Sequence, residues 1–282
     1  MATVKFEDIS YTYNKNTPYA ATALSDINIT VSGNGITGLI GHTGSGKSTL
    51  VQMINGLIKP TSGKVYIDGV DIWAEPKKIR NVRFKAGLVM QYPEHQLFAE
   101  TVEEDIAFGP RNMGLSGDAL KERIMEAVRF SGLSPELLSK SPFELSGGQK
   151  RRVALAGVMA MGPEILILDE PAAGLDPGGR RDILGKIKSY ARESGTCVII
   201  VSHSMEDMAM YCDDLIVMAG GKVIMHAPTA EVFTHSEKLL SVGLDVPQIT
   251  KIAVALGRNG IDIGEDIYTV GFAAERLLGK EK

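Results

Sequence analysis

Short apolar runs separated by amphipathic stretches are the main pattern of this chain of 282 residues. Between residues 3 and 40, three runs with Gly and Asn between them read as short strands: V-K-F-E-D-I-S-Y-T-Y, L-S-D-I-N-I-T-V and I-T-G-L-I. Two later runs, 165–168 and 197–201, are apolar at nearly every position, as in parallel strands that are buried on both faces. Helical spacing appears between and after these runs, so the pattern predicts an α/β fold.

Residues 92–162 carry no strong strand signal, and we expect a helical subdomain inserted into the core. Thr101 and Glu104 have the spacing of a capping box, and Gly109-Pro110 is predicted to end the helix that begins there. Farther on, Gly220-Gly221 predicts a hairpin across residues 214–225.

The last part of the chain, from Thr229, predicts two or three helices. One apolar stripe precedes Gly257, and a second apolar helix is predicted near residues 269–278. The stripe consists of Val246, Ile249, Ile252, Ala253 and Leu256. Because this segment holds no chemical motif, it is interpreted as a packing or subunit-contact element.

A glycine-rich segment between the strand at residues 36–40 and an amphipathic helix matches the phosphate-loop pattern G-x-x-x-x-G-K-[ST]. It consists of Gly41, His42, Thr43, Gly44, Ser45, Gly46, Lys47, Ser48 and Thr49. Glycines let backbone N–H groups approach phosphate oxygens, and the helix N-terminus favours negative charge. Lys47 is predicted to contact the β- and γ-phosphates and Ser48 to bind Mg²⁺. The alternative, a glycine-rich turn with an incidental lysine, does not explain the flanking strand and helix.

Acidic residues follow the buried strand at 165–168. Two adjacent carboxylates are costly there unless they serve a cation or a reaction, so we expect Asp169 to hold Mg²⁺ through water and Glu170 to polarise an attacking water. The alternative is a strand that simply emerges into solvent. His203 follows the next buried strand and is expected to contact the γ-phosphate, although a lone histidine is usually structural. Asp176 lies in a turn expected near this site.

Two further motifs each have two interpretations. Tyr11 and Tyr13 could line one face of a strand, or one of them could stack on adenine; beside a phosphate loop we favour Tyr13 for stacking. The segment L-S-G-G-Q has capping-box spacing and free N–H donors, so it is either a capped helix start or a second phosphate site. Its polar residues are Ser146, Gly147, Gly148 and Gln149.

Composition limits the remaining possibilities. Hydrophobic residues make up 44% and charged residues 23% of the chain, as in globular proteins. The net charge of −4 argues against a general nucleic-acid binder, and the basic run at 77–85 is interpreted as a solvated face rather than a lipid contact. No run approaches the roughly 18 apolar residues of a membrane span, and the N-terminus lacks a signal-peptide core. Cys197 and Cys212 are expected to be small core residues.

Together these motifs resemble the ATPase of an ABC transporter over about residues 3–228. The resemblance implies a RecA-like P-loop core with an antiparallel β subdomain and the inserted helical subdomain. It divides the chain into an ATPase domain, 1–228, and a C-terminal helical dimerisation element, 229–282. Gln91 would join Ser48 at Mg²⁺, Glu170 would act as general base and His203 as sensor of the γ-phosphate. Ser146 to Gln149 would contact ATP held by the opposite subunit.

The segment Q-Y-P-E-H-Q-L-F-A-E-T-V narrows the resemblance to ATPases of energy-coupling factor importers. The phosphate-loop form G-H-T-G-S-G-K-S-T, the upstream Y-T-Y-N-K-N-T-P-Y and D-E-P-A-A-G-L-D most resemble the second (A′) ATPase subunit of these importers. This implies a motor subunit that hydrolyses ATP with Mg²⁺ to drive vitamin or micronutrient uptake. The implied partners are a second homologous ATPase, a transmembrane coupling subunit and a separate substrate-binding membrane subunit, with no nucleic acid. The coupling subunit would contact Tyr92, Pro93, Leu97 and Phe98, which implies a location on the cytoplasmic face of a bacterial membrane.

Alternative functions remain open at this stage. A homodimeric cobalt- or nickel-importer ATPase differs only in its partner. A soluble ABC protein that acts on ribosomes or DNA is disfavoured, because such chains usually carry two cassettes or a long heptad insertion. The sequence identifies neither the transported solute, nor the A or A′ identity, nor a homodimer or heterodimer.

Overall fold

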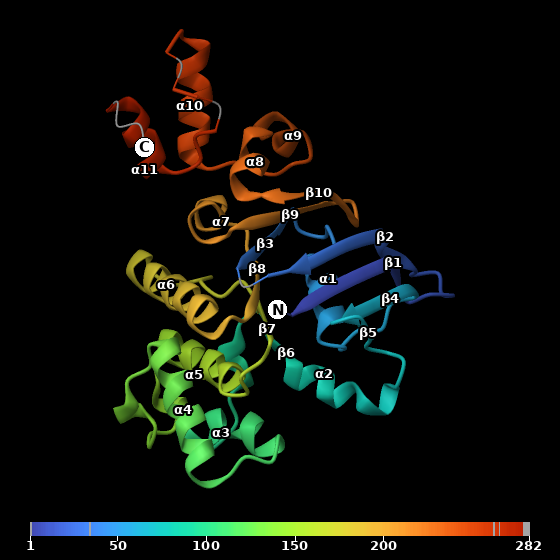
Figure 1. Ribbon diagram of the computed structural model, residues 1–282, viewed down its shortest axis with the longest axis vertical. Coiled ribbons are helices and arrows are strands. Elements are labelled where there is room, and N and C mark those ends of the chain that lie inside the picture. Colours follow the sequence, from blue (N-terminus) through green and yellow to red (C-terminus); the bar gives the residue numbers. More distant parts are fainter. Residues whose placement is uncertain (1, 34, 262, 265, 279–282) are drawn as a thin grey trace.

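The computed structural model describes residues 2–33, 35–261, 263–264 and 266–278. A six-stranded sheet lies at its centre, with a four-stranded antiparallel sheet on one side and a group of helices below (Figure 1). A separate pair of helices forms the C-terminal end at the opposite pole from that group (Figure 1). Residue 1 and residues 279–282, the outer ends of the two predicted domains, lie outside the described residues.

The two sheets use different strand pairings. The four-stranded sheet has the order β2-β1-β4-β5 and the six-stranded sheet the order β10-β9-β3-β8-β7-β6. In the larger sheet β6, β7, β8, β3 and β9 are parallel, and only β10 pairs antiparallel, with β9. The strands are β1 (Thr3–Tyr13), β2 (Ala21–Ser32), β3 (Ile36–Gly41), β4 (Ser62–Ile67), β5 (Val70–Asp71), β6 (Ala86–Val89), β7 (Ile165–Asp169), β8 (Cys197–Val201), β9 (Asp214–Ala219) and β10 (Lys222–Pro228).

Helices connect and cover these strands. The α-helices are α1 (Lys47–Ile54), α2 (Ile79–Lys85), α3 (Val102–Asn112), α4 (Gly117–Ser131), α5 (Gly147–Met159), α6 (Pro177–Ser194), α7 (Met205–Tyr211), α8 (Thr229–Thr234), α9 (Ser236–Ser241), α10 (Gln248–Arg258) and α11 (Val270–Leu277). Short 3₁₀ helices are η1 (Pro76–Lys78), η2 (Pro93–Gln96), η3 (Pro135–Leu137) and η4 (Pro142–Glu144). All regular elements described between residues 92 and 162 are helical.

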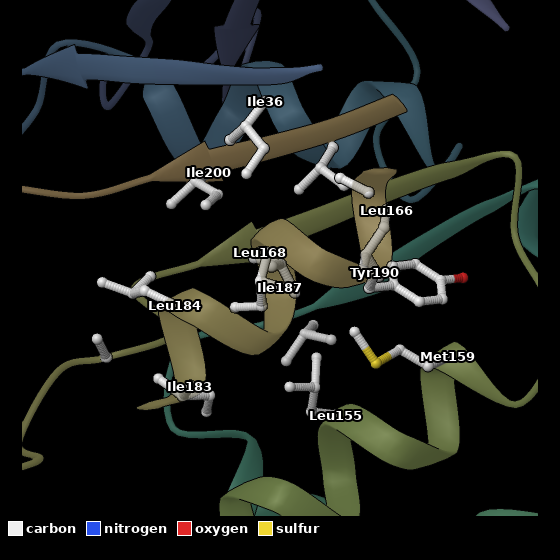
Figure 2. Close-up of a cluster of buried hydrophobic side chains, with 14 of the residues drawn as sticks. Ile36, Leu155, Met159, Leu166, Leu168, Ile183, Leu184, Ile187, Tyr190 and Ile200 are labelled. Carbon is white, nitrogen blue, oxygen red and sulfur yellow. The ribbon is translucent and has the colours of Figure 1, made fainter. Parts of the chain in front are cut away.

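The parallel strands are apolar on both faces because each face has its own hydrophobic core. In β7, Ile165 and Ile167 pack with the four-stranded sheet and α1, whereas Leu166 and Leu168 pack with the helices on the other face. Figure 2 shows the second core, where Ile183, Leu184 and Ile187 of α6 and Leu155 and Met159 of α5 meet strand residues such as Leu166 and Ile200. Cys197 and Cys212 are both buried, as expected.

The predicted end of the helix at Gly109-Pro110 is wrong. α3 continues through Pro110 to Asn112, and the left-handed Gly114 (φ 92°) follows it. A proline removes one helical N–H and restricts the residue before it, so a helix usually ends at or before the preceding residue. The backbone N–H of Met113 still donates to the carbonyls of Gly109 and Pro110, so the turn closes around the proline.

The C-terminal stripe is only partly buried. Ala253 is 6% exposed and packs with Ile267 and Ala273, but Ile252 on the same helix is 51% exposed. The hydrophobic side chains that α10 and α11 leave exposed are Ile252, Val254, Val270 and Leu277. This end of the molecule therefore presents apolar surface that its own core does not cover.

Candidate active site

The phosphate loop joins β3 to α1 in a conformation that requires glycine. Gly46 caps α1 with a left-handed φ of 101°, and a Cβ atom there would lie 2.6 Å from the carbonyl oxygen of Ala23. At Gly41 a Cβ atom would lie 2.4 Å from Oγ of Ser45. The backbone N–H groups at the start of α1 have no intrahelical partners by position, so they are donors for an anion.

Lys47 lies at the start of α1 and is only 6% exposed. Its Nζ donates hydrogen bonds to the carbonyl oxygens of Gly41, at 2.6 Å, and His42, at 3.0 Å. Burial lowers the pKa of Lys47, while the nearby charges of Glu170 and Asp169 act in the opposite direction. The phosphate loop thus holds a partly desolvated ammonium group inside its turn. Water shields the charge of this ammonium less than it shields that of a surface lysine.

Ser48 and Asp169 form the oxygen-rich end of the site. The hydroxyl Oγ of Ser48 donates a hydrogen bond to Oδ2 of Asp169 at 3.1 Å. Burial raises the pKa of Asp169, against the hydrogen bond from Ser48 and the charge of Lys47. A hydroxyl, a carboxylate and the Gln91 amide form an all-oxygen donor set of the kind that Mg²⁺ prefers, so these residues fit that ion.

Glu170 follows β7 directly and adopts a left-handed backbone, with a φ of 54°. Its Oε1 atom is buried and, within the described part of the chain, has no hydrogen-bond partner. Burial raises the pKa of Glu170, and the adjacent charge of Asp169 raises it further. A strained backbone and a buried carboxylate oxygen without a hydrogen-bond partner both cost stability, which is typical of a functional residue.

His203 lies beyond the end of β8, the strand next to β7. Its Nε2 is 3.5 Å from Oε1 of Glu170, and its side chain is 56% exposed. Burial and the charge of Lys47 lower the pKa of His203, so the neutral imidazole dominates near pH 7. The contact with Glu170 is therefore not a charge pair at that pH.

A cavity of about 490 Å³ brings most of the predicted site residues together. Its lining residues are Tyr13, Ala21, Thr22, Ala23, Thr43, Gly44, Gly46, Lys47, Ser48, Thr49, Gln91, Asp169, Glu170, Val201 and His203. These residues come from β1, β2, the phosphate loop and the carboxyl ends of β6, β7 and β8. Ligands bind at this edge of open α/β sheets.

Tyr13, rather than Tyr11, lines the cavity. The Tyr13 hydroxyl lies 2.9 Å from Oγ1 of Thr49, and the Tyr11 ring packs edge-on against the Tyr13 ring at 4.7 Å. Tyr13 is 39% exposed, so part of its side chain is open to a ligand in the cavity. The contacts hold the ring at the mouth of the phosphate loop.

The L-S-G-G-Q segment and Asp176 lie apart from this cavity, since none of its described lining residues comes from either. Ser146 and Gln149 make both hydrogen bonds of a capping box at the start of α5, at 2.9 and 3.3 Å. Asp176 caps α6 by accepting from the N–H groups of Gly178 and Gly179. Backbone hydrogen bonds from these glycines lower its pKa.

Sequence reasoning missed several cavity residues. Ala21, Thr22 and Ala23 in β2 line the cavity but carry no motif, and their small size is the only signal they offer. The sequence places Thr49 in the phosphate loop, but its contact with Tyr13 leaves no local signal because the two residues are 36 positions apart.

The segment predicted to contact a membrane partner is only partly exposed. The side chains of Tyr92 and Phe98 are 54% and 60% exposed, whereas Pro93 is buried and Leu97 packs partly against the core. Phe98 packs edge-on against Phe108 of α3 at 4.9 Å, and the two rings form an exposed aromatic pair. No helix in the described part of the chain is long and apolar enough to span a membrane.

Comparison with known proteins gives a consistent result. The family model described as ABC transporter matches residues 24–173. The energy-coupling factor transporter ATP-binding protein EcfA2 of Caldanaerobacter subterraneus subsp. tengcongensis is 53% identical, over 98% of this chain and 96% of that protein. The protein of the same name from Clostridium acetobutylicum is 51% identical, again over 98% and 96%.

Solved structures agree with the fold. The structure of cbiO1 from Clostridium perfringens, described as part of the ABC transporter complex cbiONQ, has a TM-score of 0.76 and 38% identity, and the match covers 91% of this chain and 96% of that one. A dimeric ATP-binding cassette bound to ADP and phosphate has a TM-score of 0.72 and 28% identity, over 80% and 98%. The chain therefore belongs to the ABC transporter family, and within it to the ATP-binding proteins of energy-coupling factor transporters, ATPases that drive import.

Proposed function

We propose that this chain holds MgATP in the cavity beside β3 and α1 and completes a hydrolytic site only when a second ATPase chain faces it. The observation that carries this proposal is the separation of two sets of residues. The phosphate loop, Gln91, Glu170 and His203 share one cavity, while the L-S-G-G-Q helix start is placed elsewhere in the same chain. Each set is half of a site.

In the first half-site, the ring of Tyr13 stacks on adenine and the loop N–H groups bind the phosphates. Lys47 exchanges its bonds to the carbonyls of Gly41 and His42 for phosphate oxygens, because an ionic partner is stronger than a neutral one. Ser48, Gln91 and, through water, Asp169 hold Mg²⁺, which supplies charge neutralisation for the phosphates when bound.

Glu170 is the general base. Its carboxylate accepts a proton from a water molecule whose oxygen attacks the γ-phosphorus atom. The bond to the bridging oxygen of ADP breaks, and the products are ADP and inorganic phosphate. A raised pKa makes Glu170 a better base than a surface carboxylate, and neutral His203 can donate a hydrogen bond to the γ-phosphate.

The second half-site, Ser146 to Gln149, contacts the ATP of the opposite chain. Its hydroxyl and helix N-terminus are suited to the γ-phosphate, and Asp176 lies at the start of the neighbouring α6. A second, related ATPase is the partner we expect. The solved neighbours support pairing, because one is a dimer and another is described as part of a multi-subunit transporter complex.

The exposed rings of Tyr92 and Phe98 provide the contact for a transmembrane coupling subunit. Buried Pro93 and half-buried Leu97 hold this segment against the body of the protein. We therefore place the chain on the cytoplasmic face of the membrane. The 229–282 segment, with its exposed apolar side chains on α10 and α11, is suited to strengthen the ATPase pair, and a separate membrane subunit binds the solute.

The test uses Ser146→Arg in a Glu170→Gln background, which slows hydrolysis and preserves the ATP-bound pair. The chain, alone and together with its companion ATPase, is analysed by native mass measurement with and without MgATP. We expect Glu170→Gln to pair on ATP addition and the added Ser146→Arg to prevent pairing. Both variants should bind a fluorescent ATP analogue equally, because Ser146 lies outside the chain's own cavity. Equal ATP-dependent pairing by both variants would refute the two-chain site.

A further inference from the structure

Arg151 is a buried cation on the second turn of α5, only 5% exposed. Its guanidinium bonds to two segments that are distant in sequence. Nε and Nη2 donate to the carboxylate of Glu94 at 3.0–3.2 Å, and Nη1 donates to the backbone carbonyl of Ala173. A lysine has one ammonium group and could not satisfy both acceptors with the same geometry.

Each of the three connected segments belongs to a different part of the proposed machinery. Glu94 lies in η2, two residues after the exposed Tyr92 and within the segment proposed to contact the membrane partner. Arg151 lies five residues after Ser146, the cap of the helix start proposed to face the opposite ATP. Ala173 lies three residues before Asp176, between the general base and the cap of α6.

The ion pair is well formed. Burial by itself raises the pKa of Glu94, but the hydrogen bonds and charge of Arg151 outweigh it, so the pKa lies below its ordinary value. The far end of the same segment is also held, because the backbone N–H groups of Phe98 and Ala99 donate to Oδ2 of Asp105 at 3.0 and 2.9 Å. The segment is thus fixed at both ends and exposed between them.

We propose that Arg151 is a positioning residue that links the docking segment, residues 92–98, to helix α5 and to the 172–176 segment after Glu170. A displacement of Tyr92 or Phe98 is transmitted through the Arg151 guanidinium to the start of α5 and to the Ala173 carbonyl. Docking of the membrane partner thereby adjusts the residues that face the opposite ATP, without contact between Arg151 and any nucleotide. This inference rests on the proposed function and deepens it.

The test is a double-mutant cycle with Glu94→Gln and Arg151→Met, made in the complex purified with its membrane partners. We expect each single variant to lower kcat about tenfold, within the range typical of coupling between sites, with KM for ATP unchanged. The double variant should lower kcat no further than the more affected single variant does, because both substitutions remove the same Glu94–Arg151 ion pair. Arg151→Lys should have a kcat between those of the wild type and Arg151→Met, since lysine keeps the positive charge but lacks the planar guanidinium that bonds to both acceptors.

A second cycle on the same helix serves as the control. Nη1 of Arg152 donates to the carbonyl of Ser131 at 2.8 Å and forms an ion pair with the Asp182 carboxylate at 2.8 Å. It connects α5 to α4 and α6 but not to the docking segment. Arg152→Met and Asp182→Asn should therefore lower the unfolding temperature about as much as the Arg151 and Glu94 variants do. They should leave kcat within about twofold of the wild-type value.

Amide exchange of residues 172–176, measured with and without the membrane partners, gives a readout that a purely structural role would not change. In the wild type we expect partner binding to slow exchange there, and in Glu94→Gln we expect that response to be lost. The proposal is overturned if both cycles change kcat equally, or if the exchange response survives. Neither result bears on Glu170, whose own substitution tests the proposed function separately.

Discussion

The Nε2 atom of His203 lies 3.5 Å from Oε1 of Glu170, at the carboxyl ends of two neighbouring parallel strands. The two side chains face the same cavity as Lys47 and Ser48. Glu170 has a raised pKa and His203 a lowered one, so a base and a neutral donor stand side by side near pH 7. Under the proposed function, this pairing provides a proton acceptor and a phosphate contact at adjacent positions.

Glu170→Gln should lower the steady-state ATPase rate of the assembled complex by about 10²–10³-fold, the usual cost of losing one well-placed catalytic group. The amide has nearly the same shape but cannot accept the proton of the attacking water. Binding of a fluorescent ATP analogue should be unchanged within about twofold. A turnover near the wild-type rate would show that Glu170 is not the base.

The same substitution should stabilise the fold at high pH. A carboxyl group whose pKa is raised by folding favours the folded state below the unfolded pKa, and this contribution is lost as the pH rises through the folded pKa. Wild-type Glu170 therefore carries an unfavourable buried charge at about pH 8. Glu170→Gln should raise the unfolding temperature there by about 2–6 °C and by less near pH 5.

Thermal unfolding at both pH values checks this, with Glu103→Gln on the exposed surface of α3 as the control. The control should show no pH-dependent gain. An equal gain for Glu170→Gln at the two pH values would mean that charge burial is not its cause.

Tyr13→Ala should weaken ATP binding by about 5- to 150-fold, the range expected for one lost base-stacking contact. Tyr13→Phe keeps the ring and loses only the contact with Thr49, so it should cost about two- to tenfold. Titration with a fluorescent ATP analogue measures both. Tyr19→Ala, at a ring that is 81% exposed and outside the lining of the cavity, should bind as the wild type does. Equal losses at positions 13 and 19 would contradict the stacking role.

Phe98→Asp should abolish co-purification of membrane subunits with the tagged chain. The substitution places a charge within the exposed aromatic pair of Phe98 and Phe108, where an apolar partner surface would have to desolvate it. Binding of ATP to the isolated chain should not change, because Phe98 lies outside the cavity lining. Val70→Asp, at a site 65% exposed on β5, is the matched control and should co-purify normally.

Much of the fold follows from local patterns. The four apolar residues from Ile165 to Leu168 predict a strand buried on both faces, and the strand separates two hydrophobic cores. The capping box at Ser146 and Gln149 forms as predicted because its two hydrogen bonds join residues only three apart. The predicted helix end at Gly109-Pro110 is wrong because the backbone N–H of Met113 donates to the carbonyls of Gly109 and Pro110 and closes a turn around the proline.

The sequence by itself determined which side chains could perform the chemistry, because the phosphate loop, Asp169-Glu170 and L-S-G-G-Q are contiguous motifs whose geometry is local. Only the tertiary structure decided which of them meet. Tyr13 reaches Thr49 across 36 residues and Arg151 reaches Glu94 across 57, and neither pair leaves a periodic signal in the chain. Such contacts depend on how strands and helices pack, and packing places residues by volume and direction rather than by spacing.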